Sequence, residues 1–574
     1  MSTATQEPIV LTRDYPKQTM ARSVPGAFWD SDEKAWVLRV EDITPRAAAV
    51  VLKLFPDLAV PHPELEEIRD RAIQDVRPFD NATPFCHYVS LSAPNVADAL
   101  SPNHELIGSA DAPSVVVGDG EQWWYQFQNL DLGYMVAVLK EHGGAYIGWE
   151  RGLGKTLGAY TIADALKAEN VIVVAPNTAK TTVWLPEARR FWPHEAIVLP
   201  NQKTKRERTM RRVLDMRQQG VPVLLIVHYE ALAIIGGKDG RGWNKYGPWD
   251  LVVADEAHRI KNPKAKMTRA LKKVPTKYKL ALSGSIIQNH ADELFSPLQW
   301  LFPERYRSKW RDWNDRFLDY VDGGFSRVFV GIKLERLEEL REELGVFMVY
   351  RRKEDELDLP PRTEENIYVE LSSAQRKAYE ELVSSCLAEL EDGTKIKAQD
   401  GLPMLGALRQ VATGLDLVSG EMEDSTKLDL AFEMIEDNED EAFVVFSWYK
   451  AAAHAMAARL EAKGIESFVV TGDVKQDKRA EMIARFQEGE GRVFIGTLST
   501  LGESVNLFRA NNAIFLDRSW NPATNVQAAD RIYRIGQDKP VTVTHIIAKD
   551  TVDEHRVLPT ITNKEALRRL ILGG

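Results

Sequence analysis

The chain has 574 residues, of which 44% are hydrophobic and 27% charged, and its formal net charge is −11. The composition is that of an ordinary globular protein, and the length exceeds what one hydrophobic core serves, so we expect several domains. The sequence shows no apolar run of membrane-spanning length and no signal-peptide pattern, which predicts no membrane contact. Two distant cysteines, Cys86 and Cys386, exclude a disulfide framework and a cysteine-based zinc site. An acidic chain can still carry a local basic groove for nucleic acid.

The N-terminal segment predicts a small α+β module over residues 1–60, joined to the rest by a connecting segment over 61–115. The stretch SVPGAFWDSDEKAWVLRV, Ser23 to Val40, predicts two strands around the polar turn DSDEK. Trp29 and Trp36 flank this turn, and aromatic side chains of this size commonly form the core of a small domain.

Beyond this segment, short apolar runs alternate with helical patterns, which is typical of parallel sheets with crossover helices. The fold class we expect is therefore α/β, with two lobes. The runs that predict strands of a first sheet are Val171 to Pro176, Val223 to Tyr229, Leu251 to Ala257 and Tyr278 to Gly284; those of a second are Ala442 to Ser447, Ser467 to Gly472, Arg492 to Thr497, Ala513 to Ser519 and Val541 to Ile547.

The stretch AYIGWERGLGKTLGAY, residues 145–160, has the form of a phosphate-binding loop between a strand and a helix. Gly152 and Gly154, on either side of Leu153, allow a tight turn whose N–H groups point at an anion. Lys155 would reach the terminal phosphates of a nucleotide, and Thr156 would place its hydroxyl on Mg²⁺.

The match to the standard phosphate-loop pattern is incomplete, because Trp149 stands where its first glycine is expected. A glycine-rich strand-to-helix turn in some other α/β domain is the alternative. The basic run Lys203 to Arg217 allows two interpretations as well, a solvated helix face or part of a nucleic-acid groove, and the first is favoured.

An acidic pair follows the predicted strand in VVADEAH. Asp255 can hold magnesium while Glu256 orients or deprotonates an attacking water. Ligands bind at the carboxyl ends of parallel strands, which is where the pair lies. Two solvated carboxylates at a strand end are the alternative.

The region from about 290 to 440 is largely helical and is interrupted by RRKEDELDLPPR, whose charges and paired prolines indicate a linker. We therefore expect a first lobe over 116–350 with a helical insertion near 290–345, a linker over 351–370, a helical insertion over 371–440 and a second lobe over 441–574.

The second lobe carries QAADRIYRIGQ, residues 527–537. Gln527, Arg531 and Arg534 have the spacing i, i+4, i+7, which puts them on one face of a helix. Guanidinium groups on such a face can neutralise charge that develops on a transferring phosphoryl group. An arginine-rich surface helix is the alternative.

Taken together, these motifs resemble those of the Swi/Snf family, whose members are helicase-like, ATP-driven DNA translocases. The family belongs to helicase superfamily two, and the acidic motif of this chain is similar to a DEAH box. DEAHRIKN and WNPATNVQAADRIYRIGQ are the most specific pieces. The matching segments, in chain order, are Trp124 to Gln126, Gly152 to Thr156, Ala175 to Trp184, Asp255 to Asn262, Leu282 to Pro303, Arg351 to Arg362, Ser499 to Leu507, Trp520 to Gln537 and Ala548 to His555.

The resemblance implies two tandem RecA-like lobes with ATP and Mg²⁺ as cofactors. It implies that Gln126 reads the adenine with Tyr125 or Trp124 packed nearby, and that Glu503 lines the cleft. It also implies that Arg531 and Arg534 complete the ATP site when the lobes close. DNA-backbone contacts are implied for Thr178 and Lys180 and for the surroundings of Ser447 and Thr497.

The sequence departs from the family pattern at two motifs. Ile286 stands where the family has proline, and Thr500, Leu501 and Ser504 stand where it has alanine and glycines. Loss of glycine narrows the backbone freedom of a loop that must approach its ligands, so coupling of hydrolysis to movement is in question more than binding.

The N-terminal module is similar to the small substrate-binding module of the HepA-related annealing-helicase branch and its bacterial or phage relatives. The function that follows from these resemblances is an ATP-dependent motor that moves on or remodels double-stranded or forked DNA, in repair, replication or recombination. The alternatives are a strand-separating DNA or RNA helicase and a nucleotide-dependent DNA clamp with little turnover. We expect a cytoplasmic monomer from a bacterial, archaeal or phage-infected cell.

Overall fold

The computed structural model describes most of residues 126–564 and a few short pieces nearer the N-terminus. The described residues are 9–12, 21, 24, 27–30, 34–39, 43, 51, 58, 65, 115–117, 120–122, 126–192, 194–237, 240–288, 290–307, 310–322, 327–357, 359–391, 398–419, 425–501, 506–534 and 536–564. Four residues singled out from the sequence, Trp124, Tyr125, Glu503 and Ser504, lie outside these ranges.

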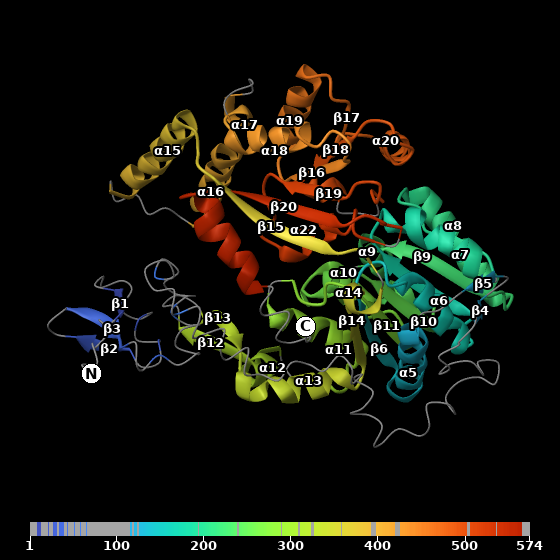
Figure 1. Cartoon of the computed structure of the whole chain (residues 1–574). Coiled ribbons are helices and arrows are strands. Elements are labelled where there is room, and N and C mark those ends of the chain that lie inside the picture. Colours follow the sequence, from blue (N-terminus) through green and yellow to red (C-terminus); the bar gives the residue numbers. More distant parts are fainter. Residues whose placement is uncertain are drawn as a thin grey trace.

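A parallel seven-stranded sheet forms the centre of the first lobe (Figure 1). Its order is β14-β6-β11-β10-β7-β9-β8. The strands are β6 (Gly144–Trp149), β7 (Asn170–Ala175), β8 (Ala196–Val198), β9 (Val223–His228), β10 (Trp249–Asp255), β11 (Thr276–Leu282) and β14 (Met348–Arg351). The four strands predicted from the sequence for this sheet are confirmed.

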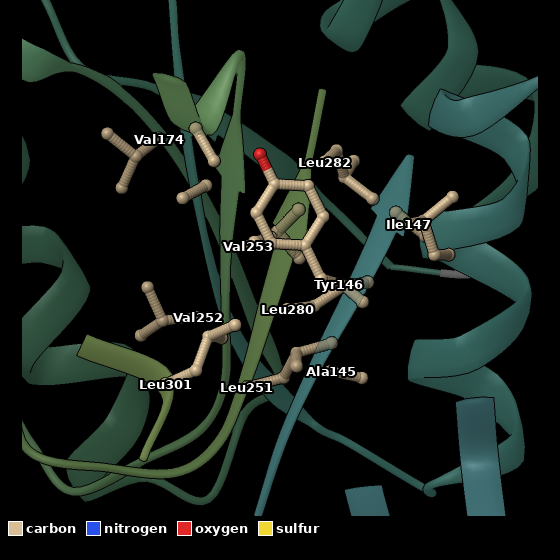
Figure 2. Packing of buried hydrophobic residues seen from close by; sticks show 14 of the residues in the cluster. Ala145, Tyr146, Ile147, Val174, Leu251, Val252, Val253, Leu280, Leu282 and Leu301 are labelled. Atoms are coloured by element: carbon tan, nitrogen blue, oxygen red, sulfur yellow. The ribbon is translucent and has the colours of Figure 1, made fainter. Parts of the chain in front are cut away.

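Strands β6 and β9 are buried along their whole length, and β7 and β10 along most of it, because helices cover both faces of a parallel sheet. Figure 2 shows the ring of Tyr146 among Val253, Leu280 and Leu282, from three adjacent strands, and all four side chains are at most 1% exposed. The surrounding helices are α5 (Gln126–His142), α6 (Lys155–Ala165), α7 (Leu185–Phe191), α8 (Lys203–Gln218), α9 (Tyr229–Gly236) and α10 (Lys266–Leu271). The basic run Lys203 to Arg217 lies in α8, which buries Arg206, Met210 and Val213 and exposes most of its other side chains.

A second parallel sheet, of six strands in the order β15-β20-β19-β16-β18-β17, forms the other lobe. Its strands are β15 (Arg362–Val369), β16 (Phe443–Ser447), β17 (Ser467–Val470), β18 (Val493–Thr497), β19 (Asn512–Phe515) and β20 (Val541–Ala548). Its helices are α18 (Thr426–Glu436), α19 (Lys450–Ala462), α20 (Gln476–Gln487), α21 (Leu498–Leu501) and α22 (Pro522–Ala529). The expected fold class, two α/β lobes with parallel sheets, is confirmed.

The segments between the two sheets differ from the expected division. The first insertion contains α11 (Phe295–Leu301), α12 (Trp310–Phe317) and α13 (Leu337–Gly345), but also the hairpin β12 (Leu318–Asp322) and β13 (Arg327–Ile332). After α14 (Lys353–Glu356), the second half of the expected linker forms β15, which pairs with β20. Most of β15 is polar and exposed because it is an edge strand, so no apolar run marks it in the sequence. The helices α15 (Ser373–Glu391), α16 (Ala398–Thr413) and α17 (Asp416–Ser419) follow.

Near the N-terminus, β1 (Ile9–Thr12), β2 (Phe28–Asp30) and β3 (Ala35–Leu38) form an antiparallel sheet in the order β1-β3-β2. The predicted pair of strands is therefore confirmed, and Trp29 lies opposite Trp36 in the register. Trp36 packs against the small core of this sheet, which also includes Val321 of β12. Figure 1 shows the sheet beside the β12–β13 hairpin at the edge of the molecule. A short ladder of β4 (Val115–Val117) and β5 (Gly120–Gln122) precedes α5.

A buried ion pair connects the end of β6 to α5 and β14 in the first lobe. Asp131 on α5 accepts two hydrogen bonds from Arg351 at the end of β14, of 2.8 and 3.0 Å, and one of 2.7 Å from the indole N–H of Trp149. The Asp131 side chain is 1% exposed. Because Trp149 is the last residue of β6, this carboxylate holds the strand that leads into the phosphate loop.

Asp131→Ala is expected to lower the free energy of unfolding of lobe 1 by about 3 kcal/mol, because two N–H groups of Arg351 and the indole N–H lose their acceptor, while the Glu356 carboxylate, at 3.1 Å, stays paired with Arg351. Urea denaturation followed by tryptophan fluorescence measures this. The matched control is Asp473→Ala, which removes the exposed partner of Lys450 and should leave the transition in place. Equal losses in the two variants would show that the pair does not hold lobe 1 together.

Candidate nucleotide site

The phosphate loop runs from Glu150 to Gly154, between the end of β6 and the start of α6. Gly154 has φ = +85°, and a Cβ there would lie 2.7 Å from Nε2 of Gln128, so only glycine fits. That amide donates to the Leu153 carbonyl at 2.9 Å, while the Leu153 side chain is buried in the core. Gln128 therefore stabilises the loop by a hydrogen bond to its backbone. Nothing in the sequence around Gln128 indicates this role.

Lys155 is the first residue of α6, so its ammonium and the free N–H groups of the helix start lie at the same place. Its Nζ donates to the carbonyls of Trp149 and Glu150, at 2.8 and 3.1 Å. Burial lowers the pKa of Lys155, and Glu256 opposes that shift. The ammonium is folded back on its own loop, within reach of an anion held there. Thr156 follows at the second helical position.

Asp255 is the last residue of β10 and is held by two aromatic side chains. The indole of Trp184 donates to its Oδ2 at 2.8 Å, and the hydroxyl of Tyr229 donates to its backbone carbonyl at 2.6 Å. Burial, followed by the negative charge of Glu256, raises the pKa of Asp255 to about 6. Two adjacent buried carboxylates raise the energy of the site, and a divalent cation would relieve it.

Glu256 has φ = +52°, a left-handed conformation that is uncommon for a residue with a side chain. Its Oε1 accepts a hydrogen bond from Nη2 of Arg151 at 2.9 Å, and its Oε2 lies 3.3 Å from Nδ1 of His258. Burial would raise the pKa of Glu256, but Arg151, His258 and Lys155 outweigh it and lower it. Glu256 therefore stays ionised at the position expected for the group that handles the attacking water.

A chain of polar contacts crosses from this acidic pair to the second lobe. Nδ1 of His258 lies 3.0 Å from the hydroxyl of Ser283, and that hydroxyl accepts from the N–H of Ser285 at 3.1 Å. The Ser285 hydroxyl accepts a 3.3 Å hydrogen bond from Nε2 of Gln527. Ile286, the residue in place of proline, is 2% exposed and packs in the core. Thus the hydroxyls of this motif connect the two lobes.

The two arginines of the second lobe stand at different places. Arg531 is 6% exposed, and burial, followed by the nearby Arg151 guanidinium, lowers its pKa to about 9. The charge of Glu256 opposes this shift, so Arg531 lies within electrostatic range of the acidic pair of the first lobe. Arg534 instead donates to Asn506 within its own lobe. Of the two arginines, Arg531 is therefore the one whose pKa responds to the charge of Glu256.

The prediction that Gln527, Arg531 and Arg534 share one continuous helix is wrong. Helix α22 ends at Ala529, and both arginines lie in the turn that follows. The N–H groups of Arg531 and Ile532 bond three residues back, to Ala528 and Ala529. These bonds tighten the turn while Ile532, 0% exposed, is drawn into the core.

The linker also connects the phosphate loop to this turn. The Tyr350 hydroxyl donates to the Glu150 carboxylate at 3.0 Å, and the N–H of Lys353 lies 3.3 Å from its other oxygen. The ammonium of Lys353 in turn forms a buried ion pair with Asp530 and donates to the Tyr533 carbonyl at 3.1 Å. Burial opposes ionisation of Asp530, but Lys353 and Arg362 keep its pKa below the ordinary value.

A pocket opens between the lobes at this point. It is lined by Glu150, Arg151, Gly284, Ser285 and Ile287 from lobe 1 and by Pro522, Ala523, Val526, Gln527, Asp530 and Lys564 from lobe 2. Its walls thus come from the phosphate loop, from the Ser283–Ser285 motif and from α22.

The residues present fit ATP and Mg²⁺. A glycine turn too tight for a Cβ, a lysine at a helix start and a buried arginine supply N–H donors and positive charge for phosphates. The Asp255 carboxylate and the Thr156 hydroxyl are hard oxygen ligands of the kind that Mg²⁺ prefers. The donor set is therefore that of a metal–nucleotide site rather than of a simple anion site.

Other predicted residues are placed differently or lie outside the description. Gln126 begins α5, but its side chain is not among the described ones, and Glu503 lies outside the described residues. The prediction that Lys180 contacts DNA is wrong, because its ammonium is buried among the Leu199 carbonyl, Asn201 and His228, each at 3.2 Å. The side chains of Ser447 and Thr497 are likewise buried within lobe 2, although Trp448 beside Ser447 is 47% exposed.

Two family models match the chain. One, described as the SNF2-related domain, matches residues 125–417, and the other, the helicase conserved C-terminal domain, matches residues 426–536. Together they cover the site residues of both lobes.

Similar proteins include the Arabidopsis thaliana ATP-dependent DNA helicase DDM1, which is 28% identical over 78% of this chain and 62% of its own length. Others are the human SWI/SNF-related matrix-associated actin-dependent regulator of chromatin subfamily A member 1 (27%, 78% and 43%) and the Bacillus subtilis putative ATP-dependent helicase/translocase YwqA (29%, 56% and 36%). The chain thus spans less than two thirds of the length of these relatives. A solved structure, the Sulfolobus solfataricus SWI2/SNF2 ATPase core in complex with dsDNA, is 24% identical with a TM-score of 0.37, over 80% of this chain and 99% of that one.

Asp255→Asn is expected to stabilise the nucleotide-free protein at pH 7.5. A carboxyl whose pKa rises from 3.8 to about 6 on folding binds more protons in the folded state, so stability falls as pH rises through that window. The variant escapes this loss, by on the order of 2 kcal/mol at pH 7.5. Most of the difference should vanish by about pH 4.5.

Thermal unfolding of both proteins across this pH range, without Mg²⁺ or nucleotide, is the measurement. Asp440→Asn, on an exposed turn, is the control and should not change the profile. A destabilised Asp255→Asn protein at pH 7.5 would contradict the electrostatic description of the acidic pair.

Proposed function

The chain belongs to the SNF2-related family, and from this premise we propose that it is a DNA-dependent ATP hydrolase that uses ATP to move on or remodel DNA. The observation that carries the proposal is a pocket between the lobes, with the phosphate loop that precedes Lys155 on one wall and Gln527 and Asp530 of the second lobe on the other. Glu256 pairs with Arg151 of this loop, and Arg531 directly follows Asp530. Hydrolysis at such a site depends on how the lobes are arranged, which is the requirement for a motor.

The residues have distinct proposed roles. Lys155 and the loop N–H groups bind the terminal phosphates, and Asp255 and Thr156 would hold Mg²⁺, which neutralises phosphate charge. Glu256 orients or deprotonates the water that attacks the terminal phosphorus. Arg531 supplies positive charge from the second lobe as negative charge develops.

The proposed substrate is double-stranded or forked DNA. The relatives' names describe DNA helicases, a translocase and a chromatin regulator, and none of the described elements is an additional strand-separating domain. We therefore favour translocation or remodelling over unwinding, by a protein acting as a monomer in the cytoplasm of a bacterial, archaeal or phage-infected cell. We propose a substrate-binding role for the small N-terminal module.

Among the described residues, no helix is long and apolar enough to cross a membrane.

The test of the function is the steady-state ATPase rate with no nucleic acid and with single-stranded DNA, duplex DNA, forked DNA and RNA. We expect strong stimulation by duplex or forked DNA, and no hydrolysis by Lys155→Ala or Glu256→Gln, which lack the phosphate-binding ammonium and the water-directing carboxylate. Stimulation by single strands or RNA alone would indicate a helicase. ATP binding without turnover on every substrate would indicate a clamp, and near-normal turnover by Glu256→Gln would reject the assignment.

Arg531→Ala is expected to lower the ATP turnover number on the order of a thousandfold on duplex DNA, because it removes the charge that lobe 2 presents to the phosphates. Arg531→Lys should recover little, since an ammonium lacks the planar fork of donors. Arg534→Ala should lower turnover to a similar extent if closure brings this residue into the site as well. Full activity of Arg531→Ala would show that lobe 2 takes no direct part in hydrolysis.

A further inference from the structure

Arg151 lies in the phosphate loop and is paired with the residue proposed to handle the attacking water. Its Nη2 lies 2.9 Å from Oε1 of Glu256, and the two side chains are 24% and 16% exposed. The other oxygen of Glu256 lies 3.3 Å from Nδ1 of His258, is buried and accepts no hydrogen bond from the part of the chain that the structure describes. Among the described contacts, Arg151 is therefore the hydrogen-bond donor that holds the carboxylate of Glu256.

The second lobe presents a charge that competes with Arg151. Arg151 lines the pocket between the lobes together with Gln527 and Asp530. Its guanidinium is close enough to Arg531 to lower the pKa of that residue, after burial the largest cause. The positive charge of Arg151 therefore acts on Arg531 across the boundary between the lobes, and like charges that move closer together repel each other more strongly.

A second carboxylate, that of Asp530, lies at the wall of the same pocket. It is paired with Lys353 and Arg362, and the charge of Arg151 also lowers its pKa. A negative charge therefore remains near Arg151 when it no longer pairs with Glu256.

We propose that Arg151 is a positioning residue that restrains Glu256 until the second lobe closes with Arg531, so that hydrolysis waits for DNA. This inference rests on the proposed ATPase function. In the resting arrangement the Arg151–Glu256 pair holds the carboxylate away from water. When lobe 2 moves inward on DNA, Arg531 takes its place at the phosphates, repulsion displaces Arg151, and Glu256 becomes available.

Removal of Arg151 should raise the ATP turnover number without DNA, whereas removal of a residue that assists hydrolysis would lower it. Arg151→Met should raise the turnover number without DNA by about tenfold while leaving the rate on duplex DNA and the KM for ATP nearly unchanged, because only the restraint is lost. Arg151→Lys keeps a cation and should restore most of the wild-type stimulation. The control, Arg485→Met, removes an exposed arginine that pairs with Glu490 at 2.6 Å and should behave as wild type.

Two further variants separate this result from other causes. The double variant Arg151→Met/Glu256→Gln should be inactive, which shows that the raised rate passes through Glu256. A fall in turnover with and without DNA, or an unchanged ratio of the two rates, would overturn the proposal. If the wild-type protein shows no DNA-stimulated hydrolysis, the proposed function fails instead.

A second measurement holds whether or not ATP is hydrolysed. In the nucleotide-free protein the pair ties the phosphate loop to the end of β10, so Arg151→Met and Glu256→Ala should each speed amide hydrogen exchange over residues 150–154. Arg485→Met should not. Unchanged exchange in both site variants would show that the pair imposes no restraint, and would overturn the proposal.

Discussion

Ionisable groups held largely out of water where the two lobes meet determine how the site is built. Lys155, Asp255 and Glu256 belong to the first lobe, and Arg531 of the second lobe lies within range of the charge of Glu256. Without a ligand, the three groups of the first lobe are held by hydrogen bonds within that lobe, while burial and neighbouring charges shift the pKa of all four groups away from its ordinary value. Such a site is poised for a ligand that brings both negative phosphates and a divalent cation, and its energy falls when that ligand binds.

Hydrogen bonds and ion pairs around the site connect the first lobe to the linker and to the second lobe. Asp131 fixes the strand that enters the phosphate loop, and Lys353 of the linker reaches Asp530 next to Arg531. Gln527 bonds Ser285, whose backbone N–H leads back through Ser283 and His258 to the acidic pair. Each of these contacts joins residues that are far apart in the sequence, and together they connect the phosphate loop and the acidic pair to the second lobe.

The sequence predicted the parts of this arrangement that are local. The phosphate loop and the acidic pair are each formed by neighbouring residues in the sequence. In each sheet, four of the interior strands are apolar enough to be recognised as runs in the sequence. It missed what depends on tertiary packing: Gln128 under the loop and Trp184 on Asp255 carry no local signal, β15 is a polar edge strand, and β8 is too short for a pattern. The spacing of Gln527, Arg531 and Arg534 predicted one helix through all three residues. In the structure the helix ends at Ala529, before the arginines, and the turn that follows buries Ile532 in the core. Lys180 was expected on the DNA and is buried instead.

The central claim is that the two halves of the site close on each other when ATP and DNA are both bound. The most direct test is the distance between the lobes, measured by energy transfer between dyes on cysteines introduced at the exposed positions Ile234 and Ala462, with Cys86 and Cys386 replaced by serine. The account predicts a shorter distance when a non-hydrolysable ATP analogue and duplex DNA are added together, and a loss of that change in Lys155→Ala. A distance that stays the same under all conditions would contradict it.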